Sequence, residues 1–224
     1  MNADLIVRLV GGLIGSYLIG SIPASYLVAF YGHGVDPRTV GSGNVGATNV
    51  YRAVGARAGL VAAVLDIAKG TAAVLLARYL LPGGGPLGPQ GFALACGAAA
   101  VVGHTYTVFL GFAGGKGVAT GAGVFLAVAP GPLGASFAVF VVTIALTRYV
   151  SLGSILAAAS LPVWVALFGP EGKIPILTIS IAMALFIVIK HRSNIARIQA
   201  GTESRIGASS PRPDDHAADR PAGV

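Results

Sequence analysis

Long apolar segments alternate with short polar segments along almost the whole chain. A helix rises 1.5 Å per residue, so about 20 apolar residues, or about 17 for a short crossing, span the hydrocarbon of a membrane. The pattern predicts an all-α integral membrane protein with about seven transmembrane helices, near residues 5–30, 57–81, 91–112, 117–130, 132–147, 151–168 and 174–190. The fourth and fifth segments are the shortest, so five or six spans remain possible.

The composition supports this membrane assignment. Of the 224 residues, 54% are hydrophobic and only 10% are charged, a balance that soluble domains rarely show. The apolar segments are also too numerous to be a signal peptide. The single cysteine, Cys96, excludes both a disulfide framework and a thiolate metal site. Residues 1–206 are therefore predicted to form one polytopic membrane domain, and the polar residues 207–224 a disordered cytoplasmic tail.

The breaks between the apolar segments alternate in charge, and this alternation predicts an orientation. With the amino terminus outside, the inner side holds eleven of the 15 Lys and Arg residues, as the positive-inside rule requires. The eleven are Arg38, Arg52, Arg57, Lys116, Arg148, Lys190, Arg192, Arg197, Arg205, Arg212 and Arg220. The net charge of +7 suits contact with anionic lipids and anionic substrates, whereas no arginine–aromatic pattern indicates nucleic acid.

The first inner loop contains the stretch "GSGNVGATN", residues 41–49. Its glycines permit positive φ angles that turn successive N–H groups toward one point, which makes an anion-binding nest. Ser42 within the stretch and Arg52 just after it would add a hydroxyl and a guanidinium donor. The stretch therefore predicts an anion-binding loop.

The second inner loop, "FLGFAGGKGVAT" at residues 109–120, has a similar design. Its GGKG segment leads into a helix whose first turn would carry a partial positive charge. The glycines of membrane proteins more often serve close helix packing, and for an isolated GGKG this remains the alternative. The combination with Ser, Asn, Arg and Lys on one membrane face favours anion binding. A Walker-type loop is excluded, because Leu110 stands at its first glycine and Gly117 at its Ser/Thr position.

The third stretch, "IKHRSNIARIQAGTESRIG", begins where the last apolar segment ends. If the helix continues, His191 and Asn194 share a face and can reach one ligand, although a simple interfacial role for His191 is the alternative. Glu203 is expected to hold the tail segment through ion pairs with Arg197 and Arg205.

Few acidic residues are placed to bind a metal ion. The loops offer only Asp36 and Glu203, so no metal site is predicted. Within the second apolar segment, Asp66 and Lys69 lie three residues apart and are expected to pair with each other, although a charge inside the membrane is also a functional candidate.

Together these stretches resemble the cytoplasmic motifs of the bacterial acyl-phosphate:glycerol-3-phosphate acyltransferases, the PlsY family. The resemblance runs from residue 11 to about residue 206 and rests on "GSGNVGATN" with Arg52, "GHTYTVFLGFAGGKGVAT", "YVSLGS" and "HRSNIARIQAGTE". It implies an enzyme of the bacterial inner membrane that transfers a fatty acyl group from acyl phosphate to the 1-hydroxyl of glycerol 3-phosphate, giving lysophosphatidic acid and phosphate. The implied partners are these two substrates and membrane lipids, with no cofactor, no nucleic acid and no obligate protein partner.

Site residues follow from the resemblance position by position. It assigns catalysis to Ser42, Lys116, His191 and Asn194, and substrate binding to Gly41, Gly43, Asn44, Arg52, Gly114, Gly115, Gly117 and Ser154. His104 and Glu203 are expected to give structural support, His104 by bracing the second loop through a hydrogen bond. Members of the family often carry a basic residue where this chain has Ala113.

The chemistry of an acyl phosphate fits these assignments. It is a mixed anhydride with a good leaving group, so positioned donors that stabilise the oxyanion suffice without a covalent intermediate. Lys116 would neutralise the departing phosphate, the glycine N–H groups would hold it, and Arg52 with Ser42 would bind the phosphate of glycerol 3-phosphate. Either His191 or that substrate phosphate accepts the hydroxyl proton, and the substrate phosphate is favoured.

Two other functions use the same features. A transporter or channel for a phosphate-bearing solute would need the anion-binding loops as a transport site, but the sequence shows no convincing inverted repeat. A scaffold with glycines only for packing leaves the clustered Ser, Asn and Arg residues unexplained.

Overall fold

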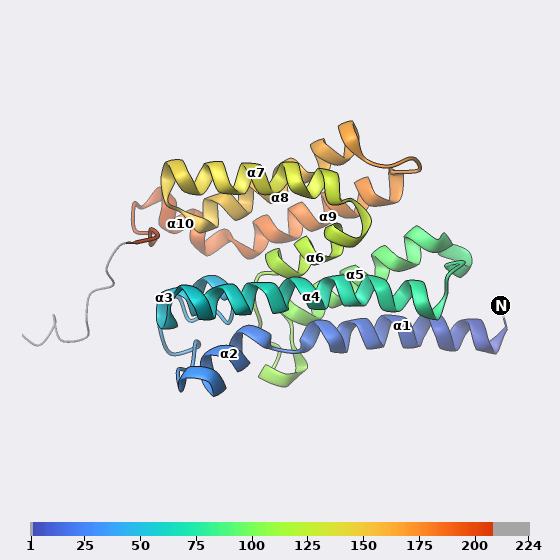
Figure 1. Ribbon diagram of the computed structural model, residues 1–224, viewed down its shortest axis with the longest axis horizontal. Coiled ribbons are helices and arrows are strands. Elements are labelled where there is room, and N and C mark those ends of the chain that lie inside the picture. Colours follow the sequence, from blue (N-terminus) through green and yellow to red (C-terminus); the bar gives the residue numbers. More distant parts are fainter. Residues whose placement is uncertain (1, 208–224) are drawn as a thin grey trace, which may run out of the picture.

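The computed structural model describes residues 2–207, which form ten α-helices and two short 3-10 helices (Figure 1). In order they are α1 (Ala3–Ser21), α2 (Ala24–His33), α3 (Ala47–Val54), α4 (Ala56–Leu80), η1 (Gly85–Leu87), α5 (Gly88–Thr105), η2 (Val108–Leu110), α6 (Val118–Val128), α7 (Pro130–Thr147), α8 (Val150–Phe168), α9 (Ile174–Lys190) and α10 (Arg192–Gln199). Apart from its first residue, the predicted tail at 207–224 lies outside the described residues.

All seven apolar segments predicted from the sequence are helical, and the all-α membrane fold is confirmed. Within residues 2–207, five stretches are long and apolar enough to cross a membrane: Ala3–His33, Ala56–Leu80, Gly85–Leu110, Pro130–Thr147 and Val150–Phe168. The pair α9 and α10 counts as a sixth only if its bend of 56° lies within one span. The remaining predicted segment, near residues 117–130, corresponds to α6.

The first predicted span is broken by a proline. Pro23 has no N–H group to continue the helical hydrogen bonds, and α1 ends at Ser21 while α2 begins at Ala24. The ammonium of Lys69 on α4 donates to the carbonyl oxygen of Ile22 at 2.9 Å. A charged side chain thus satisfies the backbone at the break.

The predicted fourth span is too short to cross a membrane alone. Helix α6 has 11 residues, about 16 Å at 1.5 Å per residue against a hydrocarbon core of about 30 Å. It packs mainly against α4, with α5, α7 and α9 also in contact. A Cβ atom at Gly70 of α4 would lie 2.1 Å from the carbonyl oxygen of Thr120, so glycine is what allows this approach. Helix α6 is therefore a short interior helix.

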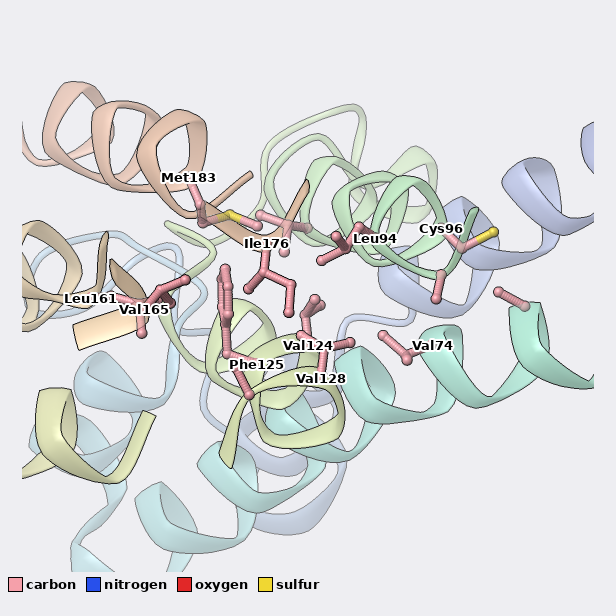
Figure 2. Close-up of a cluster of buried hydrophobic side chains, with 14 of the residues drawn as sticks. Val74, Leu94, Cys96, Val124, Phe125, Val128, Leu161, Val165, Ile176 and Met183 are labelled. Carbon is pink, nitrogen blue, oxygen red and sulfur yellow. The ribbon is translucent and has the colours of Figure 1, made fainter. Parts of the chain in front are cut away.

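The largest buried cluster surrounds α6 (Figure 2). Val124 and Phe125 of α6 are fully buried, as are Val74 of α4 and Ile176 of α9. Large apolar side chains on the outside of the bundle are exposed instead, for example Leu60, Leu146 and Leu167 among others. Such exposure suits a surface that faces lipid rather than water.

The helices form two groups with α6 between them. Helices α1, α4 and α5 pack together, and α8 packs against both α7 and α9. The amino terminus lies at one end of the bundle, while α2, α3 and α10 lie at the opposite end (Figure 1). Residues of α3 and α10 and of the loops that precede α3 and α6 line one cavity at this end.

Candidate active site

One cavity of about 330 Å³ collects residues from all three predicted stretches. Its polar lining includes Ser42, Asn44, Arg52, Lys116, His191 and Asn194. Gly117 and Ser154 also line it, and the hydroxyl of Ser154 donates to the carbonyl oxygen of Val150 at 2.9 Å within α8. The apolar lining includes Phe125, Leu133, Phe137, Phe140, Leu161 and Met183. One cavity therefore offers both cationic donors and an apolar wall.

Asn49 holds the first loop in shape, a role that the sequence did not reveal. Gly41 and Gly43 have the positive φ angles expected of a nest, 59° and 66°, but the N–H of Gly43 donates to the carbonyl oxygen of Val40 at 3.1 Å and neither glycine lines the cavity. The buried amide of Asn49 accepts the N–H of Ser42 at 2.9 Å and donates to the carbonyl oxygen of Pro37 at 2.8 Å. The N–H of Ser42 is thus already bonded, which leaves its hydroxyl as the group available to a ligand.

Two helices begin at the cavity. Helix α3 follows Gly46, and α6 follows Gly117, whose φ is 84°. Both glycines and the first two residues of each helix line the cavity. The N–H groups of a first helical turn have no partner within the helix and carry a partial positive charge. An anion in the cavity therefore meets two sets of backbone donors.

Gly114 and Gly115, which precede Lys116, do not offer their N–H groups to a phosphate as predicted. The N–H of Gly114 donates to the carbonyl oxygen of Thr105 at 3.0 Å, and that of Gly115 to the carbonyl oxygen of His104 at 3.1 Å. Neither glycine lines the cavity. Because these two N–H groups are already bonded, Gly114 and Gly115 are not part of the substrate site. Their role is close packing of the loop against the end of α5, the alternative given for an isolated GGKG.

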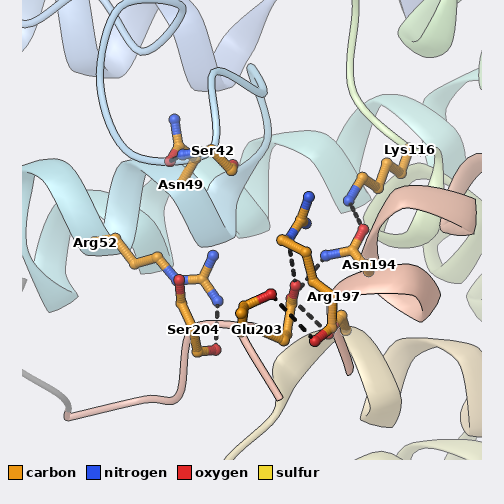
Figure 3. A network of polar contacts seen from close by, with 10 residues as sticks. Ser42, Asn49, Arg52, Lys116, Asn194, Arg197, Glu203 and Ser204 are labelled. Carbon is orange, nitrogen blue, oxygen red and sulfur yellow. Dashed lines mark hydrogen bonds and ion pairs between the residues drawn. The ribbon is translucent and has the colours of Figure 1, made fainter. Parts of the chain in front are cut away.

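Lys116 extends from this loop to α10. Its ammonium donates to Oδ1 of Asn194, and Nδ2 of Asn194 donates to Oε1 of Glu203 at 2.7 Å (Figure 3). Burial and the nearby charge of Arg197 lower the pKa of Lys116 to about 8, although Glu203 acts in the opposite direction. The lysine is therefore a cation at neutral pH whose only bonded partner among the described residues is a neutral amide.

Glu203 fixes the segment that follows α10. Its carboxylate accepts the hydroxyl of Ser151 at 2.7 Å and Nε of Arg197 at 2.7 Å, in addition to the amide of Asn194. Burial alone would raise the pKa of Glu203, but the hydrogen bonds from these three side chains hold it below its usual value. The predicted ion pair with Arg197 is present.

The second predicted ion pair is wrong. Within residues 2–207 Arg205 forms no salt bridge, and its guanidinium lies over the ring of Tyr149, 5.0 Å from the ring centre. Cation–π contact replaces the ion pair because Glu203 points inward to Ser151 and Asn194, away from the surface.

Arg52 is a half-buried cation with an unused donor. One terminal nitrogen donates to the carbonyl oxygen of Ser204 at 3.1 Å, which ties α3 to the segment after α10 (Figure 3). Its Nε atom is buried and has no hydrogen-bond partner among the described residues. Burial lowers the pKa of Arg52, but guanidinium remains charged at any physiological pH. The free donor suits an anionic ligand.

His191 lies at a bend rather than on a continuous helix. Helix α9 ends at Lys190 and α10 begins at Arg192, so the continuous helix on which a shared face depended is absent, yet His191 and Asn194 both line the cavity, where they can reach one ligand. Nδ1 of His191 lies 2.8 Å from the carbonyl oxygen of Ile187, which assigns the proton to Nδ1. Burial lowers the pKa of His191 to about 4, so the ring is neutral at pH 7.

Of the remaining predicted positions, His104 and Asp66 line the cavity, whereas Lys69 and Ala113 lie outside its lining. The carbonyl oxygen of His104 braces the second loop by accepting the N–H of Gly115, and His104 also lines the cavity. Asp66 and Lys69 form the expected ion pair at 2.9 Å. Ala113 is exposed and lies outside the cavity lining. No cluster of three metal-ligating side chains occurs in the described part of the chain.

Comparison with known proteins gives consistent matches over most of the chain. A sequence model described as glycerol-3-phosphate acyltransferase matches residues 10–201. A glycerol-3-phosphate acyltransferase of Geotalea daltonii is 49% identical over 192 residues, covering 86% of this chain and 94% of that protein. One of Desulforamulus reducens is 47% identical over 195 residues, covering 87% and 94%.

Two solved structures share the fold. The crystal structure of PlsY (YgiH), an integral membrane glycerol 3-phosphate acyltransferase, in its glycerol 3-phosphate form has a TM-score of 0.80 at 38% identity, covering 95% of this chain and 99% of that one. Its lysophosphatidic acid form has a TM-score of 0.78 at 39% identity, covering 89% and 95%.

Proposed function

The chain belongs to the glycerol-3-phosphate acyltransferase family, and from this premise we propose that an acyl phosphate is the acyl donor and that the cavity described above is the reaction site. As a membrane enzyme of this family, the protein acylates glycerol 3-phosphate and produces lysophosphatidic acid. The finer proposal concerns the donor, the 1-hydroxyl as the attacking group, and the residues that take part.

The observation that carries this proposal is that one cavity contains both positively charged groups and an apolar wall. Arg52, Lys116 and the starts of α3 and α6 supply positive charge, while Phe125, Leu161 and other apolar side chains line the same space. An acyl phosphate has one anionic end and one apolar chain, and glycerol 3-phosphate brings a second anion. Both substrates therefore find complementary surfaces next to each other.

Glycerol 3-phosphate is assigned to the side of the cavity formed by α3. Arg52 offers its unpaired Nε donor there, and Ser42 offers a hydroxyl. The first-turn N–H groups of α3 add neutral donors. These groups would hold the acceptor phosphate and direct its 1-hydroxyl to the donor.

The acyl phosphate group is assigned to Lys116 and the first turn of α6. The 1-hydroxyl oxygen attacks the acyl carbon, the carbon–oxygen bond to phosphate breaks, and phosphate leaves with the bonding electrons. Charge grows on the leaving phosphate during this step, so an ammonium at that place stabilises the transition state more than the ground state. Asn194 holds Lys116 ready for this role.

The hydroxyl proton is assigned to the phosphate of glycerol 3-phosphate. His191 is neutral, but with its pKa near 4 it is a weak proton acceptor at pH 7. A phosphate monoester has its second pKa near 6, closer to the pH of the reaction. His191 would instead orient a substrate through Nε2, since Nδ1 faces the carbonyl oxygen of Ile187.

The apolar wall is assigned to the acyl chain. It is lined by Phe125 of α6, Leu133 and Phe140 of α7, Ala158 of α8 and Met183 of α9. Helix α6 and the group formed by α7, α8 and α9 therefore line one groove, and the acyl chain would enter from the surrounding lipid.

We further propose that residues 1–206 form the catalytic domain in a bacterial inner membrane, with the amino terminus outside and the site in the cytoplasm. The excess of basic residues supports this orientation, since Arg52 on α3 and Arg197 on α10 belong to the end opposite the amino terminus (Figure 1). Glycerol 3-phosphate and the released phosphate would then exchange with the cytoplasm.

A direct assay tests the proposal. Purified protein in lipid receives palmitoyl phosphate and labelled glycerol 3-phosphate, and the expected product is labelled lysophosphatidic acid with one phosphate released for each acyl group transferred. A parallel reaction supplies palmitoyl-coenzyme A as an alternative donor. Transfer from the thioester but not from the acyl phosphate would overturn the proposed donor, and solute movement into sealed vesicles without acylation would indicate transport.

A further inference from the structure

A buried polar cluster lies behind the loop that carries Lys116. The carboxylate of Asp66 on α4 lies 2.9 Å from the ammonium of Lys69 and accepts the hydroxyl of Ser25 from α2 at 2.7 Å. Nδ1 of His104, near the end of α5, lies 3.4 Å from Oδ1 of Asp66. All four side chains are buried. The cluster joins three helices at the break between α1 and α2.

His104 connects this cluster to the loop. A Cβ atom at Gly115 would lie 2.1 Å from Nε2 of His104, so the ring lies directly against the backbone of Gly115. The carbonyl oxygen of His104 also accepts the N–H of Gly115, and that of Thr105 accepts the N–H of Gly114. The backbone from which Lys116 extends therefore rests on the end of α5.

We propose that Asp66 and His104 are a positioning pair for Lys116. The carboxylate of Asp66 fixes the ring of His104, and this ring fixes the backbone of Gly115, so that the next residue, Lys116, reaches Asn194 and the transferred phosphate. This inference rests on the proposed function, in which Lys116 stabilises the leaving phosphate. It gives the cluster a role in the rate of acyl transfer as well as in the fold.

The cost of the cluster supports a functional role. Charged side chains within membrane helices are expensive, and well-packed apolar residues of similar volume often stabilise a fold at least as well as a buried ion pair. Lys69 serves the fold, because it donates to the carbonyl oxygen of Ile22 at the break, and Asp66 balances its charge, but neither task requires the ring of His104. Asp66 and His104 also line the substrate cavity, which Lys69 and Ser25 do not.

The first test separates turnover from substrate binding. His104→Ala should lower kcat about ten- to a hundredfold, the loss expected from misplacing a catalytic group by about 1 Å, while KM for glycerol 3-phosphate stays within about twofold. The matched control is Ser180→Ala, since Ser180 is buried on α9 and, among residues 2–207, its hydroxyl bonds only to the carbonyl oxygen of Leu177 within that helix. A His104→Ala enzyme with the same kcat as the control would overturn the proposal.

A double-mutant cycle tests the contact itself. Gly115→Ala should reduce kcat strongly in the otherwise unchanged enzyme, because the new methyl group meets the ring of His104. In a His104→Ala background the same change should have little further effect, since the space is open. Additive losses would overturn the proposal. If His104→Ala does not fold, Gly115→Ala alone decides, and full activity of the folded protein would overturn it.

The pH profile gives a readout that a purely structural role would not change. Lys116 is surrounded by Arg52, Lys190, Arg197 and Glu203, and its pKa is about 8. His104→Ala should move the alkaline limb of kcat/KM to higher pH, because a displaced lysine regains solvent. A limb that stays in place in a variant with reduced kcat would assign the cluster to folding alone and overturn the proposal. The unchanged enzyme in the same assay tests the proposed function separately.

Discussion

Lys116 donates to the amide oxygen of Asn194, and this hydrogen bond joins the loop before α6 to helix α10. The other end of the same amide donates to the carboxylate of Glu203. The amide therefore separates the lysine from the acid that would otherwise neutralise it. A cation held by a neutral acceptor stays available to an anionic substrate.

The first prediction concerns this cation. Lys116→Ala should lower kcat by about a hundred- to a thousandfold, the usual effect of removing one donor that stabilises transition-state charge. Lys116→Arg should restore only part of the activity, because a planar guanidinium does not reproduce a compact ammonium in this confined place. Turnover of both variants is measured with thermal stability as the control. An active alanine variant would show that Lys116 only contacts lipid headgroups.

The second prediction concerns binding of the acceptor. Arg52→Ala should raise KM for glycerol 3-phosphate, since a charged hydrogen bond lost from a sheltered site costs about 1.5–3 kcal/mol, or roughly ten- to a hundredfold. Arg57→Ala is the matched control, because Arg57 is exposed at the start of α4 and lies outside the cavity lining. Equal KM values for the two variants would remove Arg52 from the site.

The third prediction concerns the acyl groove. Ala158→Phe should lower kcat/KM for palmitoyl phosphate relative to decanoyl phosphate about tenfold or more, because each apolar methylene excluded from the groove loses about 0.8 kcal/mol. Ala159→Phe places the same side chain at an exposed neighbouring position outside the cavity lining. A similar chain-length preference in both variants would contradict the assigned groove.

Hydropathy predicted most of the fold because helix length in a membrane depends on apolar length. The predicted ends of α4, α7, α8 and α9 lie within two residues of the observed ends. It could not show that the segment beginning at 117 forms only the 11-residue α6, since an interior helix is as apolar as a lipid-facing one. Pro23 was visible in the sequence, but that Lys69 would complete the break depends on packing.

Residue types alone predicted part of the site, whereas features that depend on contacts between residues could not be predicted. Clustered Arg52 and Lys116 indicated anion binding, and both line the cavity. The sequence could not show that Gly114 and Gly115 donate their N–H groups to the end of α5. Nor could the sequence show that Asn49 holds the first loop in shape, because an asparagine in a glycine-rich loop can bind a ligand as readily as the backbone of the loop.

The fourth prediction concerns the proton acceptor. If the phosphate of glycerol 3-phosphate is the base, kcat/KM falls as pH drops below about 6, where that phosphate becomes protonated. His191→Gln should reduce the height of the profile but keep this acid limb at the same pH, because the pKa of His191 is about 4 and its titration lies outside the limb. Loss of the limb in the variant would make His191 the base.

The fifth prediction concerns the alkaline limb. The pKa of Lys116 is lowered from its ordinary value to about 8, so the catalytic ammonium is present below this pH and is lost as pH rises through it. The value of kcat/KM, which reports groups of the free enzyme, should therefore fall above about pH 8. In Lys116→Arg the remaining activity should persist to higher pH, because guanidinium does not lose its proton in this range. The measurement is a pH profile of initial rates, with thermal stability recorded at each pH so that unfolding is separated from titration. If the alkaline limb is unchanged in the arginine variant, another group causes the titration, and the loss of the Lys116 charge does not explain the fall in kcat/KM.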